Sequence, residues 1–276
     1  MNKLVCPMCG GDKLKRVFEY DEPMEGETIF KIDEMNPYVR EVKCCEQCGH
    51  FISVQEVDMN DFYEGEYVRG TYGNELKDNY DRIVALPTKQ SDNAGRVKRI
   101  NDYFAREGKK KGVVLDIGAG LGVFLHRMVT VGWRGVALDP DEQASKHIRG
   151  VISVETICID FMKAEKIGKF DLVTFNKVLE HVKNPVSMLS KARENVKPGG
   201  FIYVEVPDGE LAVKEGKKRE EFWLGHWHIF SADSLSLLFE QAGLAVVSTG
   251  RLREPSGKFT VWAFGKTEDV ACARAA

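Results

Sequence analysis

The chain has 276 residues, of which 43% are hydrophobic and 10% aromatic, enough to bury a large core and to exclude a disordered protein. Its 39 Lys and Arg against 42 Asp and Glu give a net charge of −3, so no nucleic-acid partner is expected, because such binding needs clustered basic residues. No apolar run approaches the roughly 20 residues of a membrane helix, and the first residues lack the apolar core of a signal peptide. We therefore expect a cytoplasmic protein with no membrane partner.

Five of the seven cysteines lie in the first 48 residues, and an odd count argues against a disulfide framework. Four of them form two CxxCG motifs, Cys6 with Cys9 and Cys45 with Cys48. Two residues between thiolates let one tight turn present both sulfurs to a single ion, and the following glycine tolerates a positive φ. Together the motifs supply the four thiolates of a closed tetrahedral Zn²⁺ site.

Two alternatives to this site are a redox CxxC pair and free buried thiols. Cys44 or His50 could also replace one ligand, although the register of the second motif favours Cys45. Four ligands leave no open coordination position, so the zinc is expected to be structural and to stabilise a segment too small to bury its own core. We therefore predict a zinc-binding ribbon over residues 1–55.

The rest of the chain reads as a connector followed by one large domain. Residues 56–90 are aromatic and acidic and predict a connector or lid, and apolar residues at helical spacing predict a helix over 91–107. Strand-like and helix-like segments then alternate, which predicts a parallel doubly wound α/β sheet over residues 91–276. The expected strands are 113–115, 135–138, 154–157, 171–175, 201–206, 244–249 and 259–264. Only about ten residues join the last two, so the seventh strand should be antiparallel.

A glycine-rich loop follows the first strand of this domain, with Gly118, Gly120 and Gly122 in succession. Glycines at this place let the backbone approach a ligand at the carboxyl edge of the sheet. A nicotinamide-binding loop is the obvious rival, but the GxGxG spacing lacks the GxGxxG register of the dinucleotide fingerprint. Asp116, at the strand end two residues before the first glycine, is placed to meet an amino or hydroxyl group of a ligand.

Two further acids follow the next two strands. Asp139 ends the second strand 23 residues after Asp116 and suits ribose hydroxyls. Asp160 follows the third strand, where it could reach an adenine amino group, with Phe161 beside the ring. The three acids and the glycine loop therefore predict a binding site for a nucleoside-containing cofactor.

Several segments, in this order, resemble the class I S-adenosylmethionine-dependent methyltransferases: LDIGAGLG (115–122), ALDP (137–140), CIDF (158–161), FDLVTFNKVLEHVKNP (170–185) and VKPGGFIYVEVPD (196–208). The resemblance implies a Rossmann-like seven-stranded sheet of order 3-2-1-4-5-7-6 with strand 7 antiparallel. It also implies S-adenosyl-L-methionine as cofactor. The residues that it places around this cofactor are Asp116, Gly118 and Gly120 at the methionine and ribose, Asp139 at the ribose, Asp160 and Phe161 at the adenine, and Asn176 and Lys177 under the sulfonium end.

The segment HWHIFSADSLSLLFEQAG (226–243) is similar to the tail of many small-molecule and sugar methyltransferases. With the paired cysteine motifs, it makes the chain resemble zinc-module methyltransferases that act on nucleotide-linked sugars. The sugar C-methyltransferases of that group carry a large further domain, whereas this chain ends soon after the seventh strand. O- or N-methylation of a small, sugar-linked acceptor is therefore expected, with the acceptor and the oligomeric state left open.

A hydroxyl acceptor needs a base, and histidine is the side chain best matched to neutral pH. Candidates are His181, after the fourth strand, and His226 and His228, which could project to one side of an extended loop. The alternatives are a histidine packed at a helix start and a loop anchored by tryptophans; a metal site on the last two histidines lacks an evident third ligand. Asp208, at the end of the fifth strand, is a further candidate for touching the substrate.

Two other functions remain open at this stage. The ribbon could grip a protein or an RNA that is methylated; residues 1–70 carry a net charge of −7, which disfavours RNA but not protein. A non-catalytic binding module built on the same scaffold is the third hypothesis, and the intact set of acids and glycines argues against it.

Overall fold

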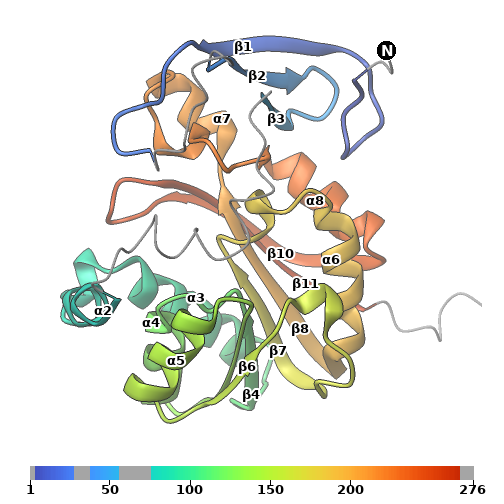
Figure 1. The fold of residues 1–276 in the computed structure, drawn as a ribbon. Helices are drawn as coiled ribbons and strands as arrows, with labels where there is room; N and C mark the ends of the chain where they lie inside the picture. Colours follow the sequence, from blue (N-terminus) through green and yellow to red (C-terminus); the bar gives the residue numbers. More distant parts are fainter. Residues whose placement is uncertain (1–3, 28–37, 56–75, 268–276) are drawn as a thin grey trace, which may run out of the picture.

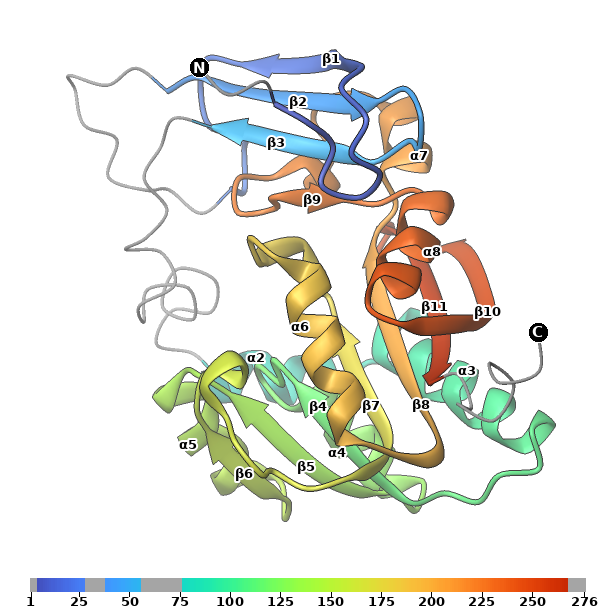
Figure 2. The ribbon, with the colours of Figure 1, turned by 90° about the vertical axis from the view of Figure 1, so that its right-hand side faces the viewer.

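The computed structural model describes residues 4–27, 38–55 and 76–267, which form two β-sheets, one above the other (Figures 1 and 2). The larger sheet has seven strands in the order β6-β5-β4-β7-β8-β11-β10. Their bounds are β4 (Val113–Ile117), β5 (Arg134–Asp139), β6 (Glu155–Cys158), β7 (Phe170–Asn176), β8 (Val196–Pro207), β10 (Leu244–Arg253) and β11 (Phe259–Thr267).

The pairing within this sheet confirms the predicted Rossmann-like fold. Counted in chain order, the seven strands stand as 3-2-1-4-5-7-6. The strands from β6 to β8 pair in parallel, whereas β11 is antiparallel to both β8 and β10. The short turn between β10 and β11 contains Gly257 at a φ of 94°. A connection of this length closes a hairpin and cannot cross over the sheet, which is why the last strand is reversed.

Helices cover both faces of the seven-stranded sheet (Figure 1). One face carries α2 (Leu76–Val84), α3 (Asp92–Arg106), α4 (Val123–Thr130) and α5 (Glu142–Val151), and the other α6 (Pro185–Ala192) and α8 (Ala232–Gln241). The predicted helix over 91–107 corresponds to α3, which buries Val97, Ile100 and Phe104 on one side. Ser91 caps it by accepting a hydrogen bond from the backbone N–H of Ala94 at 3.2 Å.

The smaller sheet combines N-terminal strands with a strand from the second half of the chain. Its order is β1-β2-β3-β9, all antiparallel, with bounds β1 (Leu14–Tyr20), β2 (Arg40–Cys45), β3 (Phe51–Gln55) and β9 (His228–Ile229). The short helix α7 (Gly209–Ala212) follows β8 and is visible under this sheet in Figure 1. Because β9 has only two residues, no periodicity in the sequence could have revealed that it completes the N-terminal sheet.

A buried ion pair fixes the smaller sheet to the loop that precedes β9. Arg40 and Glu27 lie 3.1 Å apart with both side chains almost inaccessible to solvent. Arg40 also donates to the carbonyl oxygen of Phe222, and the Glu27 carboxylate accepts from the N–H of Leu224. Two buried charges are tolerated here because each one meets the other and a backbone group.

Part of the predicted connector lies within the described residues. Residues 76–84 of this segment form α2, a helix that the sequence did not predict, whereas residues 56–75 lie outside the described residues. In the part of the chain that is described, no helix combines the length and the apolar character needed to cross a bilayer. The division into residues 1–55, 56–90 and 91–276 stays a prediction.

Candidate cofactor and acceptor site

The glycine loop lies at the carboxyl edge of the large sheet, between β4 and α4. Gly118, Gly120 and Gly122 have φ angles of 71°, 53° and 73°, a region that favours glycine. At Gly118 a side chain is also excluded sterically, because a β-carbon there would lie 2.7 Å from a methyl group of Val178. The loop therefore keeps its backbone bare at the edge where doubly wound sheets bind ligands.

Asp116 is a buried acid at the end of β4. Its Oδ1 accepts hydrogen bonds from the Thr174 hydroxyl and the Asn176 amide, both at 2.7 Å. Burial raises the pKa of Asp116 to about 7, and among the described residues no Lys or Arg forms an ion pair with it. The amide oxygen of Asn176 is buried and has no hydrogen-bond partner among the described residues. Two acceptor groups thus stand ready for a ligand that carries a positive amino group.

Asp139 is the last residue of β5, and Asp160 follows the end of β6 by two residues, as predicted. Asp139 accepts a hydrogen bond from the N–H of Gly120 at 2.8 Å, so this acid holds the glycine loop in place. Asp160 accepts from the N–H of Met162 at 2.8 Å. The Phe161 ring points elsewhere: it is 2% exposed and lies in the core, 6.2 Å from the Phe175 ring between centroids.

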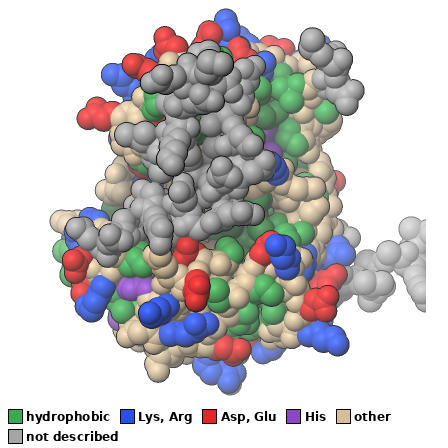
Figure 3. All heavy atoms as spheres, viewed as in Figure 1, with side chains coloured by type: hydrophobic (Ala, Val, Ile, Leu, Met, Phe, Trp, Pro, Cys, Tyr) green, Lys and Arg blue, Asp and Glu red, His purple; other side chains and the backbone are tan. Residues whose placement is uncertain are grey.

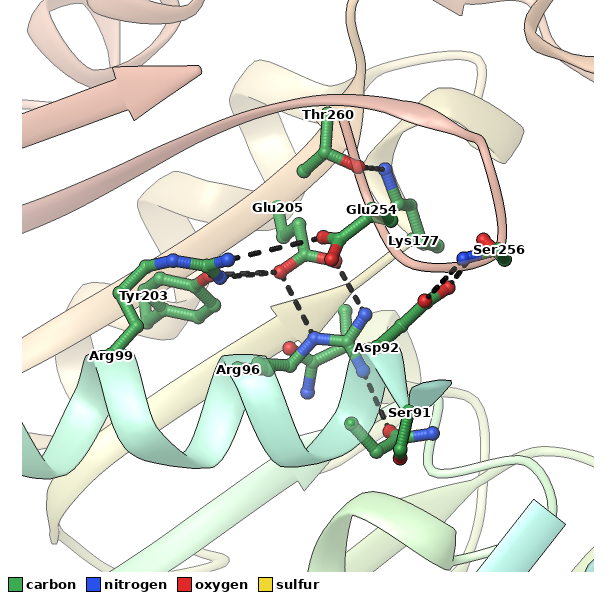
Figure 4. A network of polar contacts seen from close by, with 12 residues as sticks. Ser91, Asp92, Arg96, Arg99, Lys177, Tyr203, Glu205, Glu254, Ser256 and Thr260 are labelled. Carbon is green, nitrogen blue, oxygen red and sulfur yellow. Dashed lines mark hydrogen bonds and ion pairs between the residues drawn. The ribbon is translucent and has the colours of Figure 1, made fainter. Parts of the chain in front are cut away.

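Lys177 follows β7 with a φ of 60°, an uncommon conformation for a residue with a side chain. Its ammonium group donates to the Thr260 hydroxyl on β11 at 2.7 Å, as Figure 4 shows. Burial lowers the pKa of Lys177. Strained backbone of this kind persists only where the surroundings determine it, and it clusters at functional sites.

A buried charge network lies beside Lys177 (Figure 4). Glu205 on β8 forms ion pairs with Arg96 and Arg99 from α3, and the Tyr203 hydroxyl lies 2.5 Å from Arg99. An arginine on a helix face is usually exposed, but the Arg96 side chain is buried against β8. Glu254 stands next to this network, and burial raises its pKa to about 7. Through these contacts the polar groups of Tyr203 and Glu205 on β8 hold α3 against the sheet.

His181 and His226 come together at the loop after β7. His181 ends the short helix η4 (Leu179–His181), and its Nδ1 donates to the carbonyl oxygen of Gly225 at 2.9 Å. The Nδ1 of His226 donates to the carbonyl oxygen of Glu221 at 2.8 Å, and the two ring centroids are 4.8 Å apart. Burial lowers the pKa of His181 to about 4 and also lowers that of His226, so both rings are neutral near pH 7.

His228 has a different set of partners. Its Nδ1 lies 3.0 Å from Nε2 of His50, whose other ring nitrogen is 3.2 Å from the Ser234 hydroxyl. The expectation that His226 and His228 face one side of the loop is therefore wrong. The ring of His226 lies beside His181, whereas the pairing of β9 with β3 turns His228 toward His50 in the N-terminal segment.

The side chain of Asp208 is already occupied within the fold. It is fully buried, caps α7 by accepting from the N–H of Leu211 at 3.1 Å, and forms an ion pair with Arg251 at 2.6 Å. The end of β8 is thus closed by α7 and β10, and the structure gives Asp208 these partners in place of an open acceptor pocket.

The four predicted thiols gather beside α8. The Cys6 and Cys48 sulfurs are 3.6 Å apart, and those of Cys9 and Cys45 are 3.5 Å apart. A tetrahedral site with Zn–S bonds of about 2.3 Å requires sulfurs about 3.8 Å apart, so the set fits zinc. Cys44 lies outside this group of four, and its sulfur is 3.7 Å from the carbonyl oxygen of Cys45. The turn glycines Gly10 and Gly49 have φ angles of 72° and 68°.

A seven-stranded sheet of this order, with a glycine loop and acids at its carboxyl edge, defines the class I S-adenosylmethionine-dependent methyltransferases. A family model described as a methyltransferase domain matches residues 90–249. The chain belongs to that family.

Curated relatives cover a smaller part of the chain. The ubiquinone biosynthesis O-methyltransferase of Azotobacter vinelandii is 33% identical over 131 residues, which are 45% of this chain and 55% of that protein. The enzyme of the same name from Shewanella halifaxensis is 34% identical over 98 residues, 33% of this chain and 41% of that protein. The chain thus spans about half the length of the curated relatives it matches.

Solved structures share the fold over a larger part of the chain. The 1,6-didemethyltoxoflavin-N1-methyltransferase of Burkholderia thailandensis, solved with S-adenosylhomocysteine, has a TM-score of 0.55 at 17% identity and covers 88% of this chain and 100% of its own. The magnesium protoporphyrin IX methyltransferase of Synechocystis, also with S-adenosylhomocysteine, has a TM-score of 0.53 at 16% identity and covers 71% and 97%. At these identities the likeness concerns the fold.

Proposed function

We propose that this protein transfers a methyl group from S-adenosylmethionine to a hydroxyl oxygen of a small-molecule acceptor. The observation that carries the proposal is the loop after β7. It begins at Asn176, which donates a hydrogen bond to the buried Asp116, and reaches His181 five residues later, beside His226. The proposed cofactor-binding group Asn176 and the neutral imidazole of His181 are thereby presented on one short segment at the carboxyl edge of the sheet.

The acids at this edge match the polar parts of the cofactor. Asp116 and the orphaned amide oxygen of Asn176 would accept from the α-ammonium group, and Asp139 would accept from the ribose hydroxyls. Asp160 would meet the adenine amino group, while Phe161 would support that turn from the core. The bare backbone at Gly118 and Gly120 allows the cofactor to approach closely.

Lys177 contributes through its backbone in this proposal. Its ammonium group is bonded to Thr260, and an ammonium group close to a sulfonium would repel that positive charge. The strained turn at Lys177 then serves to direct the chain from β7 into η4. When bound, S-adenosylmethionine supplies a methyl group already activated on positively charged sulfur, so the protein mainly has to align the acceptor and exclude water.

His181 and His226 are the proposed bases for a hydroxyl acceptor. Each ring donates Nδ1–H to a backbone carbonyl, which leaves the lone pair on Nε2. A neutral imidazole with a fixed tautomer is the form that can take a proton from an attacking hydroxyl group. His228 and Asp208, whose polar atoms are bonded within the fold, are proposed to act by holding the loop and α7 in position.

A sugar-linked acceptor is the finer part of the proposal, supported by the tail segment 226–243 together with the cysteine module. A phenolic quinone precursor is the second candidate, because the curated relatives are named for ubiquinone biosynthesis. The cysteine cluster would hold a structural Zn²⁺ through Cys6, Cys9, Cys45 and Cys48. Four thiolates complete its tetrahedral coordination, so the acceptor could not bind to this ion.

The test supplies the purified protein with methyl-labelled S-adenosylmethionine and separate pools of nucleotide-linked sugars, phenols, protein and RNA. We expect label in a small-molecule pool and its loss in Asp139→Ala, which should abolish cofactor binding. Label in protein or RNA would overturn the proposed acceptor class. Tight cofactor binding with no label from any pool or from a whole-cell extract would indicate the non-catalytic scaffold.

A further inference from the structure

Glu180, His181 and His226 form a second cluster of potential metal ligands, distant in sequence from the cysteines. Each offers one ligand atom, and these three atoms all lie within 4.8 Å of one another. Glu180 is 1% exposed, and one of its carboxylate oxygens has no hydrogen-bond partner among the described residues. We propose that these residues bind one divalent transition-metal ion that holds the acceptor oxygen.

The tautomers of both imidazoles favour metal binding. A carbonyl oxygen can only accept, so the bonds to Gly225 and Glu221 place the single ring proton of each histidine on Nδ1. Nε2 then carries the lone pair in both rings, and neither ring can donate to the other. Metal-binding histidines are commonly oriented in this way, with the second ring nitrogen donating to a backbone carbonyl.

The charge of the site also favours a cation. The carboxylate of Glu180 is buried, and one of its oxygens has no hydrogen-bond partner among the described residues. A divalent ion would supply that partner. Two imidazoles and one carboxylate suit zinc, cobalt or iron and leave coordination positions open, in contrast to the closed four-thiolate cluster.

The fold holds the two halves of this cluster together. The N–H of Trp227 donates to the carbonyl oxygen of Glu180 at 2.8 Å, and the N–H of Ser53 on β3 donates to the carbonyl oxygen of Trp227 at 3.1 Å. The loop carrying His226 is thus bonded both to η4 and to the N-terminal sheet. Ligands fixed by such backbone contacts need little rearrangement to meet an ion.

The role in catalysis rests on the proposed function. An acceptor hydroxyl bound at an open position would have its pKa lowered and would lose its proton to water. The resulting alkoxide forms the new O–C bond as the C–S bond of the cofactor breaks, and S-adenosylhomocysteine leaves. With metal present, the histidines would act through the ion and not as free bases.

Titration with Co²⁺ of protein that carries a single equivalent of Zn²⁺, enough for the cysteine cluster alone, tests the site without any acceptor. We expect visible d–d bands that saturate at one equivalent per chain without a thiolate-to-cobalt charge-transfer band, and an affinity reduced at least about tenfold in Glu180→Gln and His226→Ala. His147→Asn, which changes a histidine on α5, is the matched control and should bind as the original does. Circular dichroism shows whether each variant folds. If His226→Ala fails to fold, the near-isosteric Glu180→Gln decides the test.

Absence of these bands in the original protein, or equal affinity in folded Glu180→Gln, would overturn the inference. If methyl transfer continues in full while no cobalt binds, the metal site is refuted and the proposed methyl transfer still stands. If cobalt binds but no pool is methylated, the metal site stands and the proposed function is refuted.

Discussion

The hydroxyl group of Ser231 donates a hydrogen bond to the carbonyl oxygen of Cys48 at 2.7 Å. Ser231 is the N-cap of α8 and also accepts from the N–H of Ser234 at 2.9 Å. The second cysteine knuckle is therefore bonded directly to the start of a helix that packs on β10 and β11. Since His226 lies five residues before Ser231, the cysteine cluster and the proposed acceptor site share one rigid connection.

Replacing single cysteines will distinguish the ligand from its neighbour. We expect Cys45→Ser to lower the zinc content by one equivalent per chain and to lower the melting temperature, because a three-thiolate site no longer closes around the ion. Cys44→Ser is the matched control and should leave both values unchanged, since its sulfur lies outside the cluster. Elemental analysis and thermal unfolding measure the two effects, and an equal loss of zinc in both variants would contradict the assignment.

Breaking the buried ion pair between Glu27 and Arg40 should strongly destabilise the protein. Arg40→Met leaves a buried carboxylate without its charge partner, at an expected cost of about 3–5 kcal/mol in the free energy of unfolding. The comparison is Arg16→Ala, which removes a pair with Glu41 on the same sheet where the arginine side chain is 55% exposed, and should cost less than about 1 kcal/mol. Urea unfolding would refute the prediction if the two variants lost similar stability.

Asp116→Asn should weaken cofactor binding and raise the free energy of unfolding. The folded pKa of Asp116 is raised from 3.8 to about 7, so its burial penalty is absent below pH 3.8, grows as the pH rises, and is complete above about pH 7. The variant lacks this penalty and should be more stable than the original at pH 8, by on the order of 1–3 kcal/mol.

The gain in Asp116→Asn should shrink as the pH falls from 7 toward 4. Denaturant titrations of the ligand-free protein at several pH values measure this, and calorimetry should show weakened binding of S-adenosylmethionine. A gain that does not change with pH would show that Asp116 is not the titrating group.

Asp208→Asn should affect folding and leave the chemistry unchanged. The substitution weakens the bond to Arg251 and the cap of α7, at an expected cost of about 1–3 kcal/mol. Cofactor affinity and the turnover number per folded molecule should stay as in the original protein. If the turnover number fell while the stability stayed unchanged, the result would contradict this prediction and would indicate that Asp208 contacts the acceptor.

The sequence by itself determined the large sheet and the cofactor edge. The alternation from Val113 onward was enough to predict a parallel doubly wound sheet, and the short last turn was enough to predict its antiparallel seventh strand. The order of the strands was implied by the resemblance of the motifs to the class I methyltransferases. Glycines in the left-handed region and acids at strand ends are local features, which is why Gly118, Asp139 and the cysteine motifs could be read directly.

Only the tertiary structure decided which polar groups meet across the chain. Glu205, Arg251 and His50, the long-range partners of Arg96, Asp208 and His228, lie far from them in sequence, and no local pattern encodes such pairings. The two-residue strand β9 completes the N-terminal sheet through long-range hydrogen bonds, and this pairing separates His226 from His228. Local periodicity reflects which face of an element is buried, whereas the contacts that bring Glu180, His181 and His226 together exist only once both sheets have packed.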